Sequence, residues 1–313
     1  MPSLHPAALV FPLFLAATPL HTGAAQAGTQ DDLLARQLAE VERVTERYRD
    51  VEAARRDGYR RPAFGMDAPL MGEHWVNREL LAAEVDLARP AVLQYIRDGE
   101  RRVLVGVTYG RWQRPGAPLP EGFAGDGDRW HTHDLESLVR RLGERRPAVV
   151  RWAVRRTLDA GRWRGPDGRT ELAMLHVWLW SENPDGVFAN HNPALPYLRT
   201  GLPAAWARAG DHAAARGIEL LRPGYCETAM PRLSRALDVG DDQWSTLREA
   251  CAGAAERLAA ARAGGLAGDS LNDAAAEAWQ RLTRSVYAEL TPEQQASAEI
   301  LRRAATGDEH HEH

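Results

Sequence analysis

The chain has 313 residues and a formal net charge of −4, and charged residues of both signs make up 26% of it. This small and mixed charge argues against nucleic acid as the main partner. The length is typical of one large domain or two small ones.

The N-terminus has the pattern of an export signal. An uncharged apolar run from Ala7 to Leu20 precedes Ala25-Gln26-Ala27, an A-x-A cleavage pattern. The run is too short to span a bilayer as a helix. We expect residues 1–27 to be a signal peptide and the mature protein to be periplasmic or secreted, with no membrane insertion after cleavage. The alternative is a buried N-terminal helix.

The first element expected after the signal is a helix over residues 31–58, because apolar residues recur there at helical spacing. Thr29 or Asp31 is its expected N-cap. Two β-hairpins with glycine-containing turns follow: strands 91–96 and 103–109 around Asp98-Gly99, and strands 162–164 and 172–180 around Gly165-Pro166-Asp167-Gly168. Both faces of the 172–180 strand are apolar, so we expect this strand to be central and buried.

Between the hairpins, a loop over residues 113–129 leads to a helix over residues 134–145 with Asp134 as its N-cap, and residues 147–158 continue helically. Residues 183–224 are expected to form loop and short helix. From Asp241 onward the chain is predicted to be helical, over residues 242–262, 272–289 and 292–305, the last with Thr291 at the cap and Pro292 at the first helical position.

These elements predict an α+β fold with an antiparallel sheet core, an N-terminal helix and a helical C-terminal region. The expected organisation is a signal peptide over residues 1–27, a core domain over 28–200 that carries the candidate site, a helical region over 201–306, and a disordered histidine-rich tail over 307–313.

The chain contains two cysteines, Cys226 and Cys251. An even count in an exported protein predicts a disulfide bond. Two alternatives remain open at this point: a pair of soft metal ligands, or two unrelated buried thiols.

The most informative motif is His131-Thr132-His133. Side chains two residues apart on an extended backbone point to the same side, so both imidazoles can reach one ion. Histidine is the commonest metal ligand among side chains. Nearby carboxylates are candidate ligands or partners that orient the imidazoles, namely those of Asp126, Asp128 and Asp134. The alternative is a solvated polar turn.

His74 and His176 lie in aromatic, strand-like surroundings. A buried neutral histidine needs hydrogen bonds or a metal ion. If His74, His131, His133 and His176 converge, they offer nitrogen ligands that suit Zn²⁺ or Cu²⁺ rather than Mg²⁺ or Ca²⁺. The dyad must then face the strand that carries His176. His191 and the tail histidines His310, His311 and His313 are weaker candidates, for which turn structure and disorder are the alternatives.

Two segments form a motif pair: Met71-Gly72-Glu73-His74-Trp75-Val76-Asn77, and Leu175-His176-Val177-Trp178-Leu179-Trp180 running into Asn183-Pro184-Asp185-Gly186-Val187-Phe188. Over roughly residues 65–197 the chain resembles a group of uncharacterised exported bacterial proteins with these motifs. The resemblance implies that His74 and His176 belong to one site, and it carries no assigned activity. Thr108 stands where the resemblance leads us to expect a glutamate. The C-terminal helices resemble periplasmic metal-stress and chaperone proteins through Leu290-Thr291-Pro292-Glu293-Gln294.

The sequence thus predicts an exported protein that binds copper or zinc through a histidine cluster, with a role in metal handling. A metal-dependent hydrolytic or oxidative enzyme with an open coordination position is the first alternative. A metal-free binding module with structural histidines is the second. Other chemistries lack their motifs, since the chain has no Gly-x-Ser-x-Gly elbow and no phosphate-binding glycine loop.

Overall fold

The computed structural model describes residues 22–62, 67–144, 152, 155–156 and 164–306. Its centre is a six-stranded sheet of order β1-β2-β3-β4-β6-β5, in which every neighbouring pair is antiparallel. The strands are β1 (Asp67–Ala68), β2 (Gly72–Val76), β3 (Val92–Asp98), β4 (Arg101–Gln113), β5 (His131–Asp134) and β6 (Glu171–Val177). The predicted α+β class with an antiparallel sheet core is confirmed.

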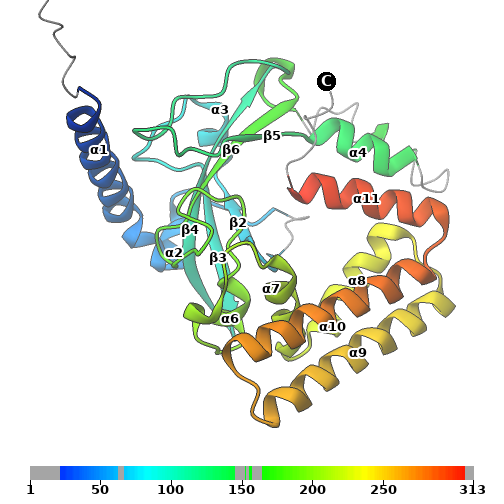
Figure 1. Cartoon of the computed structure of the whole chain (residues 1–313). Coiled ribbons are helices and arrows are strands. Elements are labelled where there is room, and N and C mark those ends of the chain that lie inside the picture. Colours follow the sequence, from blue (N-terminus) through cyan, green and yellow to red (C-terminus); the bar gives the residue numbers. More distant parts are fainter. Residues whose placement is uncertain (1–21, 63–66, 145–151, 153–154, 157–163, 307–313) are drawn as a thin grey trace, which may run out of the picture.

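Helices lie on both sides of this sheet (Figure 1). On one side are α1 (Thr22–Thr45), the 3-10 turn η1 (Glu46–Arg49) and α2 (Val51–Arg56). The other helices are α3 (Arg78–Ala82), α4 (Leu135–Glu144), α6 (Leu195–Arg199), α7 (His212–Ile218), α8 (Tyr225–Leu237), α9 (Asp241–Ala263), α10 (Gly268–Glu289) and α11 (Pro292–Thr306). In the described part of the chain, none of the helices combines the length and the apolarity needed to cross a bilayer.

The N-terminal helix differs from the prediction. Helix α1 begins at Thr22 and runs through Thr29 and Asp31, so neither residue caps it. The helix ends at Thr45, and α2 begins separately after Asp50, whose carboxylate accepts a hydrogen bond from the Glu52 backbone N–H. A single helix over 31–58 was therefore wrong, because a second cap interrupts the apolar periodicity. The apolar run of the predicted signal peptide lies outside the described residues, and its cleavage site falls within α1.

The β3–β4 hairpin forms as predicted, with Gly99 at φ 58° in its two-residue turn. The second predicted hairpin is wrong over its described residues. Over Glu171–Met174, strand β6 pairs with β4 on one edge and with β5 on the other, so no edge is left there for residues 162–164. Residues 162–163 themselves, like most of the predicted helix 147–158, lie outside the described residues. Strand β6 itself is central and buried, as expected.

Strand alternation gives the sheet two distinct faces. The face toward α1 and α2, which we call the tyrosine face, packs against Val41, Ala54 and Tyr59. Its sheet residues in this core are Trp75, Leu93, Tyr95, Leu104, Val107, Tyr109, Leu175 and Val177. The strand register places another set on the opposite face, which we call the histidine face: His74, Gln94, Thr108, His131, His133, Met174 and His176.

The C-terminal helices form a second apolar core. Helices α9, α10 and α11 confirm the predicted helices, and α8, which the sequence analysis did not anticipate, adds Cys226 to this core. Cys226 and Cys251 form a disulfide bond between α8 and α9. The predicted disulfide is confirmed, and the alternatives of a thiolate metal site or two free thiols are wrong.

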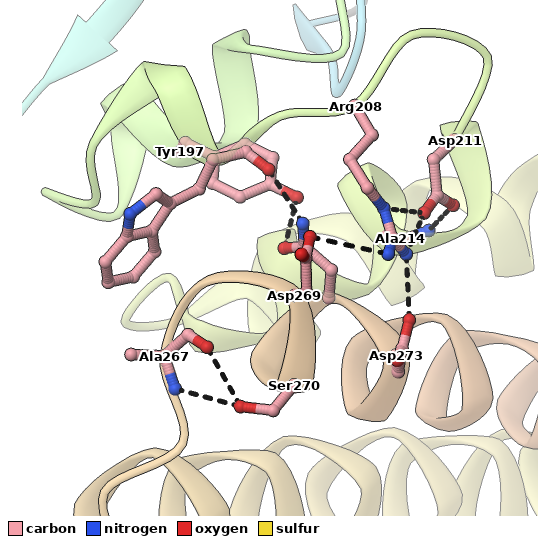
Figure 2. Close-up of polar contacts among 10 residues, drawn as sticks. Tyr197, Arg208, Asp211, Ala214, Ala267, Asp269, Ser270 and Asp273 are labelled. Carbon is pink, nitrogen blue, oxygen red and sulfur yellow. Dashed lines mark hydrogen bonds and ion pairs between the residues drawn. The ribbon is translucent and has the colours of Figure 1, made fainter.

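Polar contacts fasten α7 and the segment before it to α10 (Figure 2). Arg208 pairs with Asp211 at 2.5 Å and with Asp273 of α10 at 2.9 Å. The Tyr197 hydroxyl donates to the buried Asn272 side chain at 2.8 Å. Helix α7, which begins at His212, is therefore fastened to the C-terminal core through α10.

Candidate metal centre

All six histidines of the described residues belong to one continuous cluster. They come from five separate segments of the chain: His74 from β2, His131 and His133 from β5, His176 from β6, His191 from the loop after β6, and His212 from the first turn of α7. Because these segments are far apart in sequence, only the folded sheet brings their side chains together.

Four of the rings form an inner group on the histidine face. The ring centres of His74 and His176 are 5.6 Å apart, and those of His131 and His176 are 5.2 Å apart with nearly parallel planes. The ring centre of His133 lies 4.9 Å from that of His131. The prediction that the dyad faces the strand carrying His176 is confirmed. The pairing of His131 with Met174, two residues before His176, explains why.

The other two histidines form an outer pair. The ring centres of His191 and His212 are 5.5 Å apart. His191 lies close enough to His176 for its charged form to lower the pKa of His176. The outer pair therefore continues the inner group rather than forming a separate site.

His176 is the most deeply buried member, with no exposed surface. Its Nδ1 lies 2.9 Å from Nε2 of Gln94 and 3.2 Å from Oγ1 of Thr108, whereas its Nε2 has no hydrogen-bond partner. For Nε2 to present a free lone pair, the form that binds a metal, Nδ1 must carry the proton, and the Gln94 amide must then turn its Oε1, which also lacks a partner, toward Nδ1. When Gln94 instead donates from Nε2 to an unprotonated Nδ1, Nε2 of His176 carries a buried N–H group that lacks an acceptor.

Burial favours the neutral form of three of the four inner histidines. Desolvation lowers the pKa of His74 to about 4, although part of its side chain remains in contact with solvent. Burial also lowers the pKa of His131, partly offset by the Arg129 carbonyl and the Asn190 side chain. The pKa of His176 falls well below its usual value, first through burial and then through the neighbouring histidines. Neutral imidazole is the form of histidine that coordinates metals.

A hollow of about 470 Å³ opens beside the outer pair. His191, His212, Asp185 and Asn190 are among its lining residues. Nε2 of His212 lies 2.7 Å from Oδ2 of Asp185, whose other oxygen accepts a hydrogen bond from the Gly210 backbone N–H at 2.6 Å. The hollow gives solvent and small solutes a route to the outer histidines.

The loop that carries His191 is ordered by its own side chains. Asn183 donates to the His191 carbonyl at 2.9 Å, and Asn192 donates to the Glu182 carbonyl at 3.1 Å. The indole N–H of Trp178 donates to the Ala189 carbonyl at 2.6 Å. The Asn-Pro and Asp-Gly motifs thus act as turn formers, and in doing so they turn the loop back beside β6.

The distances between the inner rings match those of a metal site, but the directions of the ring nitrogens do not. Imidazoles bound to one tetrahedral zinc through nitrogens at about 2.0–2.1 Å have their ring centres roughly 5 Å apart, which is close to the spacings of the inner group. Across the ranges that the structure describes, no three His, Cys, Asp or Glu side chains already direct their ligand atoms at one point. Binding one ion would therefore require rotation of the rings about their χ angles.

The nearby carboxylates serve local structure. Asp134 caps α4 by accepting hydrogen bonds from the backbone N–H and the hydroxyl of Ser137, which confirms the predicted cap. Asp128 accepts a hydrogen bond from the Phe123 backbone N–H at 2.8 Å, and Asp126 is exposed. The predicted tail candidates, His310, His311 and His313, lie outside the described residues.

Sequence reasoning missed Gln94, His212 and Asp185 as parts of the site. Gln94 had a usable signal, because a polar residue at a buried strand position needs a partner. His212 follows Asp211 in an ordinary helix start, and only the packing of α7 against α6 and α10 brings it to His191. Asp185 lies in an Asp-Gly turn motif, and this local role gives no indication of its contact with His212.

Comparison of the chain with protein-family models, with curated proteins and with solved structures found no match. The two family resemblances therefore stay predictions, and the function is argued from the site.

Proposed function

We propose that this chain is an exported protein that binds a transition metal, copper or zinc, through the histidines of the histidine face, and that it acts in metal handling. The observation that carries the proposal is the convergence of all six described histidines from five chain segments. Imidazole nitrogens suit copper and zinc.

Three further features support metal binding. Three of the inner rings favour the neutral form, because burial lowers the pKa of His74, His131 and His176. Nε2 of His176 is buried without a hydrogen-bond partner, so a cation there would relieve an uncompensated polar group. Its Nδ1 is held by Gln94 and Thr108, the kind of outer partner that orients metal-binding imidazoles.

Export is supported by two features. One is the apolar N-terminal run with its A-x-A pattern. The other is the disulfide between Cys226 and Cys251, because such bonds persist in oxidising compartments.

A competition titration with zinc and a chromophoric chelator tests the proposal on the full chain. We expect one ion per chain, and a loss of affinity of about a hundredfold or more in the His131→Ala/His133→Ala variant. The matched control replaces the tail histidines His310, His311 and His313 with alanine and should bind like the wild type. If the dyad variant kept its affinity while the tail variant lost it, the histidine face would not be the site.

A second candidate, a metal-dependent enzyme, is favoured by the hollow beside the outer pair. There the His212–Asp185 pair, with atoms 2.7 Å apart, has the arrangement of a general base held by a carboxylate. In that case His212→Gln should retain zinc but lose turnover in a screen of ester, phosphoester and oxidase substrates. Zinc binding without turnover in the wild type would favour metal handling.

A further inference from the structure

A second cavity lies among the C-terminal helices, away from the histidine lining of the first hollow. Its volume is about 530 Å³, within the range of about 300–1,000 Å³ of small-molecule sites. The walls are mainly apolar side chains of α10, its C-cap and α11, including Trp279, Leu282, Val286, Leu290 and Leu301. A cavity of this volume with mainly apolar walls suits a largely apolar ligand.

One wall of this cavity carries an unusual cation. Arg216 of α7 is partly buried and lines the cavity, yet it forms no hydrogen bond or ion pair with the residues that the structure describes. Burial lowers its pKa, and the nearby Tyr225 offsets this only in part. A guanidinium withdrawn from water without an anion is costly.

Neighbouring arginines show that the chain usually provides a carboxylate. Arg199 pairs with Glu219 at 2.9 Å, although both side chains are fully buried. Arg302, which also lines the cavity, pairs with Glu299 at 2.7 Å. Among the described lining residues there is no aspartate or glutamate, so the cavity has an uncompensated positive charge at Arg216.

We propose that this cavity binds a small amphiphilic carboxylate, such as a medium-chain fatty acid, with its head group on Arg216 and its chain between α8, α10 and α11. The planar guanidinium fork matches a carboxylate in two parallel hydrogen bonds. A single unpaired cation compensates a single negative charge, which favours a monoanionic head group. The apolar wall then buries the chain. This inference does not depend on the proposed metal site.

Calorimetric titration of the full chain with dodecanoate tests the proposal, with a chelator present so that the metal site does not contribute. Dodecanol is the matched ligand without charge. We expect dodecanoate to bind at one per chain and about tenfold or more tightly than dodecanol, as for hydrogen bonds to a charged group.

Three variants assign the binding to the cavity. Arg216→Met keeps the apolar stem, so it should weaken dodecanoate binding about tenfold or more and leave dodecanol binding unchanged. Arg302→Met, at a cation already paired with Glu299, should have a much smaller effect. Ala298→Trp, which fills the cavity, should weaken both ligands.

Unfolding can be separated from loss of binding. Removal of an unpaired, partly buried cation should leave the urea midpoint of Arg216→Met unchanged or raise it. No binding of dodecanoate to the wild type, equal binding of dodecanoate and dodecanol, or an unchanged dodecanoate affinity in Arg216→Met would each overturn the proposal.

Discussion

On the tyrosine face, three buried phenols each donate to a backbone carbonyl at 2.6 Å: Tyr59 to Pro90, Tyr95 to Tyr48 and Tyr109 to Leu87. On the histidine face of the same strands, Nε2 of His176 and Oε1 of Gln94 are buried without partners. The strands that supply the two faces are shared, so backbone geometry does not explain the difference. Buried polar groups are normally satisfied, so these two atoms beside the histidine rings are open to a partner from outside the chain, although Arg111 and Gln113 of β4 also leave one buried atom each without a partner.

The carboxylate of Glu73, on the tyrosine face, is compensated by arginines of the neighbouring strands. Its side chain is 1% exposed and pairs with Arg97 at 2.8 Å and with Arg102 at 2.9 Å. Burial raises the pKa of Glu73, but hydrogen bonds from Arg102 and Arg97 outweigh it and hold that pKa below its usual value. His74, the next residue on β2, turns to the other face, where its ring centre lies 5.6 Å from that of His176.

The largest effect is expected from Glu73→Gln. Removing one partner of a buried ion pair leaves the arginines uncompensated, so the free energy of unfolding should fall by about 3 kcal/mol. Urea denaturation followed by tryptophan fluorescence measures it. Glu84→Gln is the matched control, because Glu84 pairs with Arg111 with its side chain 82% exposed and should change stability by less than about 0.5 kcal/mol. Equal effects of the two variants would contradict this account of the tyrosine face.

Mild acid should act on the histidine face first. The pKa of His74 is about 4 in the folded chain and about 6.5 when unfolded, so the unfolded state binds more protons between these values. The stabilisation is complete above pH 6.5 and is lost as pH falls toward 4, by up to about 3 kcal/mol from His74. Glu73, whose pKa is lowered, loses its contribution only at more acidic pH.

Urea midpoints of the metal-free protein between pH 7.5 and 4.5 measure this dependence. The His74→Gln variant should show a shallower slope than the wild type, because one of the depressed groups is gone. An identical slope in the variant would show that His74 does not titrate as the buried geometry requires.

Tyr109→Phe should have a smaller effect. The substitution removes the hydroxyl and leaves the Leu87 carbonyl without its donor, which should cost about 1–2 kcal/mol in the free energy of unfolding. Tyr287→Phe is the control, because the Tyr287 hydroxyl forms no hydrogen bond with the residues that the structure describes, and this variant should change stability by less than about 0.5 kcal/mol. Thermal unfolding by circular dichroism compares the two, and a neutral Tyr109→Phe would remove the contrast between the faces.

His176→Asn should have the smallest effect on the metal-free protein. The shorter amide keeps a polar atom near the position of Nδ1 for Gln94 and Thr108, while the unpartnered Nε2 is lost. We expect a change in the free energy of unfolding below about 1 kcal/mol, because a lost interaction is offset by the relief of an unsatisfied group. With zinc in excess, the wild type should gain stability and the variant should not. A loss of several kcal/mol without metal would mean that His176 is structural.

The fold could be predicted where local patterns decide it. The Asp98-Gly99 turn, the apolar β6 and the capped helix at Pro292 all formed at or near their predicted positions. The pairing of β5 with β6 could not be predicted, because it joins segments separated by the α4 region through long-range register. The start of α1 was missed because its first residues are small or polar, and α8 was missed because Pro231 lies inside it, where proline normally interrupts a helix.

The site was predictable only in part for the same reason. The alternation of His131 and His133 determines that both face one side, and His176 on a buried strand signalled an unusual polar group. The outer pair depends on how α7 packs, which no local pattern around His212 reveals.

X-ray absorption at the zinc edge tests the central claim most directly. Loaded wild-type protein should show three or four nitrogen ligands at about 2.0–2.1 Å, with the outer scattering of imidazole rings. The His131→Ala/His133→Ala variant should lose that imidazole signal. A ligand shell made only of oxygen, or an unchanged imidazole signal in the variant, would contradict a metal centre on the histidine face.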